Sequence, residues 1–250
     1  MRRFYQTEWF GLDLAKITET SPFKMANKKF YDDFYKIFYS KYSSYDQLPN
    51  YYIEKKVQVA NHLFSFIKNK NDILSIGCGI GLIEQKLSEL LEENKVSTFQ
   101  NNNIVNRQKI IAIEPSISTI QWIDSDFIEV VHGFYPEVID QKIKFDLVYA
   151  ILIDYTLNNT EYLFLLKNIV KSGAREVYFS VSVDSPLTIV SKLKELSLLL
   201  LCAFGIKSCG QLWGYLRTIE EHKSLFKEAG FQTICIGRYR DGQYYIHAEL

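Results

Sequence analysis

Three glycines at alternate positions form the stretch of this sequence best suited to hold a ligand. Gly77, Gly79 and Gly81 lie in GCGIG, directly behind the mostly apolar run 73–76. An amphipathic stretch follows at once, so the pattern predicts a strand, a tight turn and a helix. Glycine suits a turn that takes positive φ or that a ligand approaches closely. Free N–H groups and the helix dipole would favour a carboxylate or phosphate there.

The spacing of the glycines separates two kinds of nucleotide ligand. The dinucleotide fingerprint has a glycine or alanine five residues after the first glycine, and that position is Leu82. GCGIG instead resembles motif I of the class I S-adenosylmethionine-dependent methyltransferases. The family usually has an aspartate where this sequence has Ser75, so the resemblance implies that other groups bind the methionine ammonium. It makes Ser75, Cys78 and the three glycines expected cofactor contacts, and the alternative is a structural turn without a ligand.

A carboxylate follows the second predicted strand. The strand covers 110–113, and Glu114 stands at its end before Pro115. In open α/β sheets the ligand lies beyond the carboxyl ends of the strands, where an acid can accept both ribose hydroxyls. Glu114 matches the motif II acid of the family, with Pro115 beside the cofactor, and the polar loop 92–109 explains its distance from the glycines. The alternative is a solvated charge at a strand end.

The third predicted strand, 127–131, ends at His132 and Gly133. The family often has a polar residue after this glycine, next to the adenine. Phe134 stands there in this sequence. The resemblance therefore implies that Gly133 and Phe134 contact the adenine through stacking or backbone groups.

Residues for the methyl acceptor are expected after the fourth strand and near the end of the chain. Asp154 and Tyr155 fall where many small-molecule methyltransferases carry Glu-His. Asp154 is the expected catalytic base because a carboxylate is ionised at neutral pH, whereas free tyrosine has a pKa near ~10; Tyr155 would orient the acceptor. The alternative is that Asp154 caps the following helix. Trp213, Tyr215 and Arg217 combine an aromatic wall with a bidentate cation, which suits sugars, rings or anions.

The elements that position these residues alternate between strand and helix. This alternation predicts an α/β fold with a mainly parallel sheet covered on both faces. A hairpin is predicted around Asp241-Gly242. The resemblance covers 53–250 and implies a Rossmann-like sheet of seven strands in the order 3-2-1-4-5-7-6, with strand 7 antiparallel. A helical lid insertion is expected at about 186–222.

Residues 1–52 lie outside the resemblance and are expected to form an aromatic-rich helical cap. Aromatic side chains recur at three- and four-residue steps in NKKFYDDFYKIFYSKY, which predicts a helix. A second helix is expected after Leu48-Pro49-Asn50. Tyr31 and Tyr35 are expected to face the cofactor cleft as a lid, and the alternative is simple packing against the domain.

Composition limits the class of protein. Of 250 residues, 47% are apolar and 23% charged, as in globular proteins, and the zero net charge argues against a dedicated nucleic-acid binder. The four cysteines form no Cys-x-x-Cys pair, which favours a reducing, cytoplasmic location. The longest apolar run, Leu196 to Ile206, is too short to cross a bilayer and is expected to form a buried lid helix, with contact to a membrane surface as the alternative.

We interpret the sequence as that of an S-adenosylmethionine-dependent methyltransferase that acts on a small molecule, without a metal. A sugar or glycan-precursor hydroxyl is the first hypothesis for the acceptor, because WGY-x-R loosely resembles enzymes of bacterial surface-polysaccharide synthesis. Two alternatives stay open. One is a non-catalytic nucleotide- or S-adenosylmethionine-binding protein on the same fold. The other is an NAD(P)-dependent oxidoreductase, which Leu82 and the lack of a Tyr-x-x-x-Lys motif disfavour.

Overall fold

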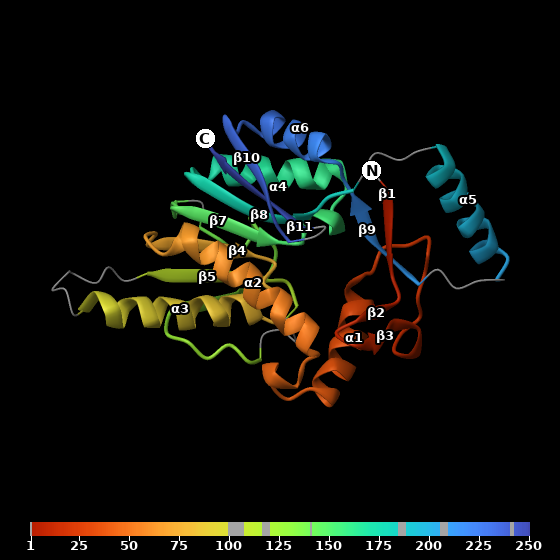
Figure 1. Ribbon diagram of the computed structural model, residues 1–250, viewed down its shortest axis with the longest axis horizontal. Helices are drawn as coiled ribbons and strands as arrows, with labels where there is room; N and C mark the ends of the chain where they lie inside the picture. The colour runs from red at the N-terminus through yellow and green to blue at the C-terminus, as the bar shows by residue number, and fades with distance from the viewer. Residues whose placement is uncertain are drawn as a thin grey trace.

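A mainly parallel sheet forms the centre of the molecule (Figure 1). The computed structural model describes residues 2–99, 108–116, 121–140, 142–184, 189–205, 210–240 and 243–250. Within these residues the sheet has seven strands: β4 (Asp72–Ile76), β5 (Lys109–Glu114), β6 (Ile128–His132), β7 (Leu147–Ile151), β8 (Glu176–Ser182), β10 (Thr233–Arg240) and β11 (Gln243–Glu249).

The strand order confirms the predicted sheet. The order β6-β5-β4-β7-β8-β11-β10 is 3-2-1-4-5-7-6 when the strands are numbered along the chain. β4 pairs in parallel with β5 and β7, whereas β11 is antiparallel to both β8 and β10. The hairpin is therefore present, although its predicted turn at Asp241-Gly242 lies outside the described residues.

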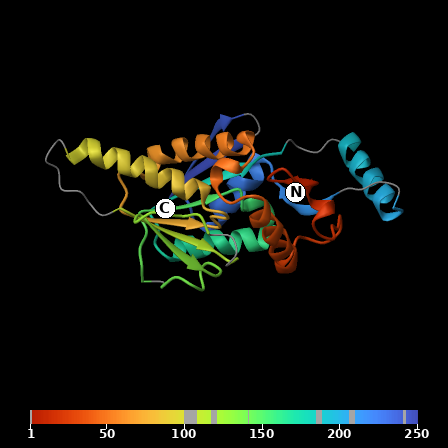
Figure 2. The ribbon, with the colours of Figure 1, turned by 90° about the horizontal axis from the view of Figure 1, so that it is seen from below.

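Helices cover both faces of the sheet (Figure 2). α2 (Asn50–Ile67) and α3 (Leu82–Phe99) pack on one face, and α4 (Asn159–Lys171) and α6 (Ile219–Ala229) pack on the other. One apolar core joins each helix pair to the sheet. β4 and β7 are buried on both faces, which explains why they read as continuous apolar runs.

Capping fixes where the helices on the second face begin. Asn158 and Glu161 form a reciprocal capping box at the start of α4, and Thr218 and Glu221 form another at the start of α6. α6 ends at Gly230, which has a φ of 115°. The chain segments just before both helices are thereby held at the carboxyl edge of the sheet.

Within residues 1–52, which were expected to form a helical cap, strands precede the first predicted helix. α1 (Lys28–Lys41) and α2 are present, but three short strands precede them: β1 (Arg2–Gln6), β2 (Glu8–Trp9) and β3 (Leu12–Asp13). The expected helical character of the cap therefore holds only from α1 onward. Short 3-10 helices, η1 (Leu14–Lys16) and η2 (Tyr45–Gln47), complete it, and its aromatic side chains form a third core.

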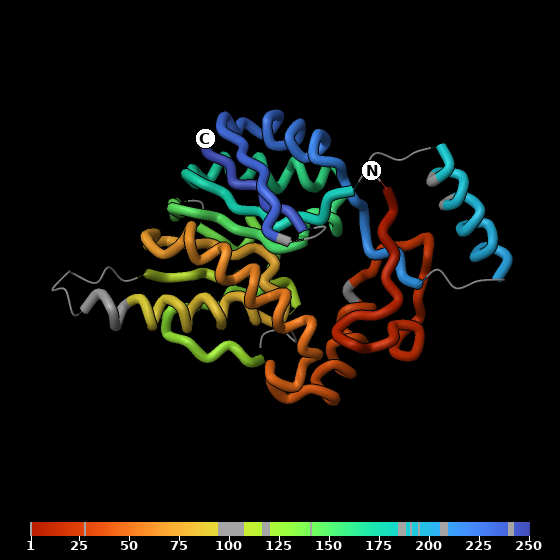
Figure 3. Tube along the Cα trace, viewed as in Figure 1, coloured from red at the N-terminus to blue at the C-terminus, as the bar shows by residue number. Residues whose placement is uncertain are grey.

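The expected helical lid insertion contains both a helix and a strand. α5 (Ile189–Ala203) is helical, but β9 (Gln211–Leu216) is a strand that pairs antiparallel with β1. Figure 3 shows the N-terminal trace beside this segment. The helical expectation for 211–216 is wrong because pairing with the far end of the chain leaves no local sequence signal.

α5 does not form the buried helix that was expected. It stands away from the sheet and its helices in Figures 1 and 2. Its apolar side chains, including Leu193, Leu196 and Leu200, are exposed. Among the described residues, no helix has the length and apolar character needed to span a membrane.

Candidate functional site

A cavity of about 1440 Å³ lies where the glycine turn was expected to bind its ligand. One part of its wall comes from the carboxyl ends of β4, β5 and β7, which is where α/β sheets bind ligands. The other part comes from the cap and from β9. Most predicted site residues line it: Ser75, Gly77, Cys78, Gly79, Glu114, Pro115, Gly133, Phe134, Tyr31, Tyr35, Tyr155, Trp213 and Tyr215.

The glycine turn has the backbone geometry that the sequence predicts. Gly77, Gly79 and Gly81 have φ angles of 71°, 59° and 75°. A Cβ on Gly77 would lie 2.7 Å from Cγ2 of Ile153, and a Cβ on Gly81 would overlap Ile123. A Cβ on Gly79 would meet nothing within 4 Å among the described residues. Gly77 and Gly81 are therefore needed for packing, whereas the position of a Cβ on Gly79 is open space beside the cavity.

Glu114 ties the end of β5 to the glycine turn. Its Oε2 accepts a hydrogen bond from the Gly79 N–H at 2.9 Å, and its Oε1 accepts one from the Ser116 N–H at 3.2 Å. Burial raises the pKa of Glu114, and these two backbone bonds oppose the rise. Burial, with the charge of Glu114 as a second cause, raises the pKa of Tyr31 to about 12. Tyr31, Tyr35 and Glu114 therefore lie close together on the cavity wall.

Residues beside the turn supply neutral and apolar surface. Burial raises the pKa of the Cys78 thiol, so this side chain is a neutral part of the wall. The Phe134 side chain is 65% exposed although it lines the cavity. Its ring is therefore free to stack on a flat ligand.

A buried carboxylate stands next to Ser75. The Ser75 hydroxyl donates to Oε1 of Glu84 at 2.7 Å, and the Tyr149 hydroxyl donates to the same oxygen at 2.9 Å. Oε2 of Glu84 has no hydrogen-bond partner in the described part of the chain. Sequence reasoning missed Glu84, although it is the acidic residue in the first turn of the helix behind the glycines.

Asp154 and Arg217 lie behind the cavity wall. Both are fully buried, and among the described residues neither they nor Gly81 line the cavity. Arg217 donates to the backbone oxygens of Asp154 at 2.6 Å and Leu157 at 2.5 Å, and to Oδ1 of Asn159 at 2.8 Å. Arg217 was expected to contact the substrate. The structure instead uses its guanidinium to hold the segment between β7 and α4.

Asp154 fits neither of its two expected positions. Asn158 caps α4, so Asp154 is not the helix cap. Its carboxylate lies 3.7 Å from Nε2 of His222, and its oxygens have no hydrogen-bond partner within the described residues. Burial raises the pKa of Asp154 to about 7, with the nearby Arg217 acting against the shift, and burial lowers that of His222 to about 3.

Trp213 and Tyr215 of the predicted wall line the cavity together with Tyr155. The ring of Phe4 meets Tyr155 edge-on at 5.7 Å, and Trp9 meets Trp213 edge-on at 4.8 Å. Burial raises the pKa of Tyr155, so its hydroxyl stays protonated and is a donor rather than a base. Sequence reasoning missed Phe4 and Trp9, which also line the cavity. Phe4 lies on β1, which pairs with β9.

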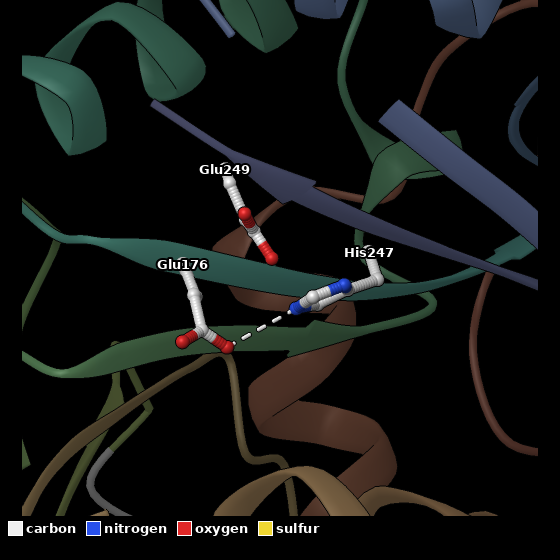
Figure 4. A group of neighbouring side chains, drawn as sticks. All are labelled: Glu176, His247 and Glu249. Atoms are coloured by element: carbon white, nitrogen blue, oxygen red, sulfur yellow. Dashed lines mark hydrogen bonds and ion pairs between the residues drawn. The ribbon is translucent and has the colours of Figure 1, made fainter. Parts of the chain in front are cut away.

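A second group of polar side chains lies on β8 and β11 (Figure 4). Glu176, His247 and Glu249 offer metal-type ligand atoms within 4.8 Å of one another. Nε2 of His247 lies 3.2 Å from Oε2 of Glu176, and Lys70 forms an ion pair with the same carboxylate. Because this ammonium already balances Glu176, we assign no metal to the group.

Comparisons with known proteins identify the fold. No protein-family model and no curated protein matches the sequence. A putative O-methyltransferase from Nostoc punctiforme PCC 73102 matches the structure with a TM-score of 0.60 and 14% identity, over 95% of this chain and 66% of that chain. The match to magnesium protoporphyrin IX methyltransferase from Synechocystis PCC 6803, solved with bound S-adenosylhomocysteine, has a TM-score of 0.53 and 13% identity, over 89% and 94%. The chain has the fold of the class I S-adenosylmethionine-dependent methyltransferases.

Human N-acetylserotonin methyltransferase, solved in complex with S-adenosylmethionine, also shares this methyltransferase fold. Its TM-score is 0.53 at 15% identity, and the match covers 78% of this chain and 50% of that chain. The chain thus spans half the length of the human protein and about two thirds of the Nostoc protein. At these identities the likeness shows the fold alone.

Proposed function

We propose that this protein is an S-adenosylmethionine-dependent methyltransferase that acts on a small-molecule acceptor. The observation that carries the proposal is the geometry of Gly79. Its N–H is bound by Glu114, and the direction of its missing Cβ opens into the cavity. A nucleoside can approach this backbone only at such a position. The shared fold with known methyltransferases supports the same reading.

The donor half of the cavity suits each part of the cofactor. Glu114 would accept the ribose hydroxyls, with Pro115 beside them, and Gly133 and Phe134 would pack on the adenine. The unpartnered oxygen of Glu84 offers an acceptor near the turn. The cofactor supplies the reactive methyl group on a sulfonium.

The acceptor half of the cavity suits a ring. Tyr155, Trp213 and Tyr215 present aromatic surface, and the neutral Tyr155 hydroxyl can donate a hydrogen bond that orients the acceptor. A sugar or glycan-precursor hydroxyl remains our first candidate, because sugars pack on aromatic faces. Because Asp154 does not reach the cavity, we assign it no proton transfer. The protein's contribution is alignment of acceptor and methyl group and exclusion of water.

The zero net charge supports the proposal that this protein has no nucleic-acid partner. The cytoplasmic location is proposed from the cysteine spacing alone, and the disulfide at Cys202 argues against it. These proposals are secondary to the binding site.

Calorimetry on the purified chain tests the proposed function. We expect S-adenosylmethionine and S-adenosylhomocysteine to bind, and NADH not to bind. Preference for NADH, or no affinity for either adenosyl compound, would overturn the proposal.

A further inference from the structure

We infer that Glu84 and Lys56 form the subsite for the amino-acid end of the methyl donor: the Glu84 carboxylate binds the α-ammonium, and the Lys56 ammonium binds the α-carboxylate. This inference rests on the proposed function and assigns the residues that bind the amino-acid end of the cofactor.

One carboxylate oxygen of Glu84 accepts hydrogen bonds, and the other has no partner among the described residues. The side chain is 1% exposed, and it lines the cavity next to the glycine turn. Ser75 and Tyr149 both donate to Oε1, so they fix the carboxylate in place. Oε2 has no partner among the residues that the structure describes. Buried polar atoms are nearly always hydrogen-bonded. We therefore expect a bound ligand to donate a hydrogen bond to Oε2 of Glu84.

Lys56 carries the complementary charge on the same cavity. It lies on α2, and no hydrogen bond or ion pair joins its ammonium to any described residue. Its Nζ lies 5.5 Å from the ring centre of Tyr52. Burial lowers the pKa of Lys56 to about 8, and the charge of Glu84 opposes this shift. A half-buried ammonium without a hydrogen-bond or ion-pair partner among the described residues is unfavourable, and a ligand carboxylate would stabilise it.

The two side chains are close enough to interact and too far apart to pair. Each is among the charges that shift the pKa of the other, yet no ion pair within 4.0 Å joins them in the described residues. Two opposite charges that face one cavity without touching are complementary to a zwitterion. The α-amino-acid end of S-adenosylmethionine is a zwitterion.

This arrangement also explains the serine in motif I. Ser75 carries no charge, but it hydrogen-bonds to a carboxylate nine residues further along the chain. The negative charge that the strand lacks is therefore supplied from the first turn of α3, where the helix dipole favours it.

Calorimetry with two probes tests the subsite. S-adenosylhomocysteine carries the amino-acid end, and 5′-methylthioadenosine lacks it. We expect Glu84→Gln and Lys56→Met each to weaken S-adenosylhomocysteine binding tenfold to hundredfold, on the scale of charged hydrogen bonds. Their affinity for 5′-methylthioadenosine should change less than twofold.

Matched variants separate this role from general effects of charge. Glu89→Gln changes a carboxylate on the same helix that pairs with Lys86, and Lys68→Met changes an exposed lysine at the end of α2. Both should bind the two probes as the unmodified protein does. If Glu84→Gln lowers the melting temperature, Lys56→Met still decides the question, because Lys56 has no hydrogen bond to lose.

Three results would count against the inference. Unchanged S-adenosylhomocysteine affinity in both variants would overturn it and leave the proposed function intact. An equal loss for both probes would also overturn it, because the pair would then act on the shape of the whole site. If the unmodified protein bound neither probe, the proposed function itself would fall.

Discussion

The two walls of the cavity differ in where their residues come from along the chain. On the sheet side, Glu114 ends β5, and Gly79 and Phe134 follow β4 and β6 by a few residues. On the cap side, Phe4 meets Tyr155 and Trp9 meets Trp213, so residues from the N-terminal segment contact residues far along the chain. The pairing of β1 with β9 brings these segments together. A local motif therefore builds the donor wall, and long-range pairing builds the acceptor wall. Changes on the two sides should separate donor binding from acceptor use.

Gly79→Val should have the largest effect on the donor wall. A branched side chain would occupy the open space in front of the turn, so we expect S-adenosylhomocysteine affinity to fall by more than about a hundredfold. The positive φ adds a stability cost of about 1–3 kcal/mol. Calorimetry and thermal melting measure the two effects separately.

Gly173→Val is the matched control for Gly79→Val. Gly173 also has a positive φ of 75° and open space around it, but in the described chain it does not line the cavity. It should lose similar stability and keep its affinity. If Gly79→Val binds S-adenosylhomocysteine normally, the cofactor does not lie against the turn.

Glu114→Ala should weaken S-adenosylhomocysteine binding by about ten- to a hundredfold, because bonds to a charged acceptor contribute about 1.5–3 kcal/mol. Glu114→Gln should lose less, since it keeps an acceptor oxygen. Glu129→Ala on β6, whose partner is Lys109, serves as a control away from the cavity. If Glu114→Ala and the unmodified protein bind S-adenosylhomocysteine equally well, Glu114 does not bind the ribose.

The contrast between the walls explains what could be predicted. The mainly parallel sheet, the glycine turn and Glu114 follow from local patterns, because alternation and spacing indicate where the strands end. The strand order was implied by the resemblance to the methyltransferase family. The exact partners of Ser75 depend on which way Glu84 turns after folding, so the sequence could show only that an acid was missing. The strand at 211–216 had no local signal, because its partner lies in residues 2–6. The position of Arg217 could not be predicted either. Its side chain turns away from the cavity because three oxygen acceptors, on Asp154, Leu157 and Asn159, lie behind the wall.

Gly214→Ala should disturb the acceptor wall and leave the donor wall intact. A Cβ on Gly214 would overlap the backbone oxygen of Tyr155, so β9 must move away from the segment after β7. We expect a loss of about 1–3 kcal/mol of unfolding free energy and slower methyl transfer. S-adenosylhomocysteine affinity should change less than twofold. A variant that loses donor affinity as strongly as Glu114→Ala would show that the walls are not separable.

Asp154→Asn should have the smallest effect on activity and a distinct effect on stability. The pKa of Asp154 is raised to about 7 from an ordinary value of 3.8, so the native state holds this proton more tightly than the unfolded state. Its contribution to stability therefore falls as pH rises from about 4 to about 7, and the loss is complete above that range. His222, whose pKa is lowered to about 3, contributes with the opposite sign below pH 6.5.

The difference between Asp154→Asn and the unmodified protein isolates the carboxylate, because His222 and Arg217 are present in both. Asparagine mimics the protonated acid, so unfolding free energies should be nearly equal at pH 4. At pH 8 the variant should be more stable by about 4 kcal/mol, because raising the pKa from 3.8 to about 7 costs about 1.4 kcal/mol per unit. Because Asp154 lies behind the wall, S-adenosylhomocysteine affinity and methyl transfer should stay within about threefold. Loss of transfer with unchanged donor affinity would instead return Asp154 to the mechanism as the base and would require the wall around Tyr155 to open during turnover.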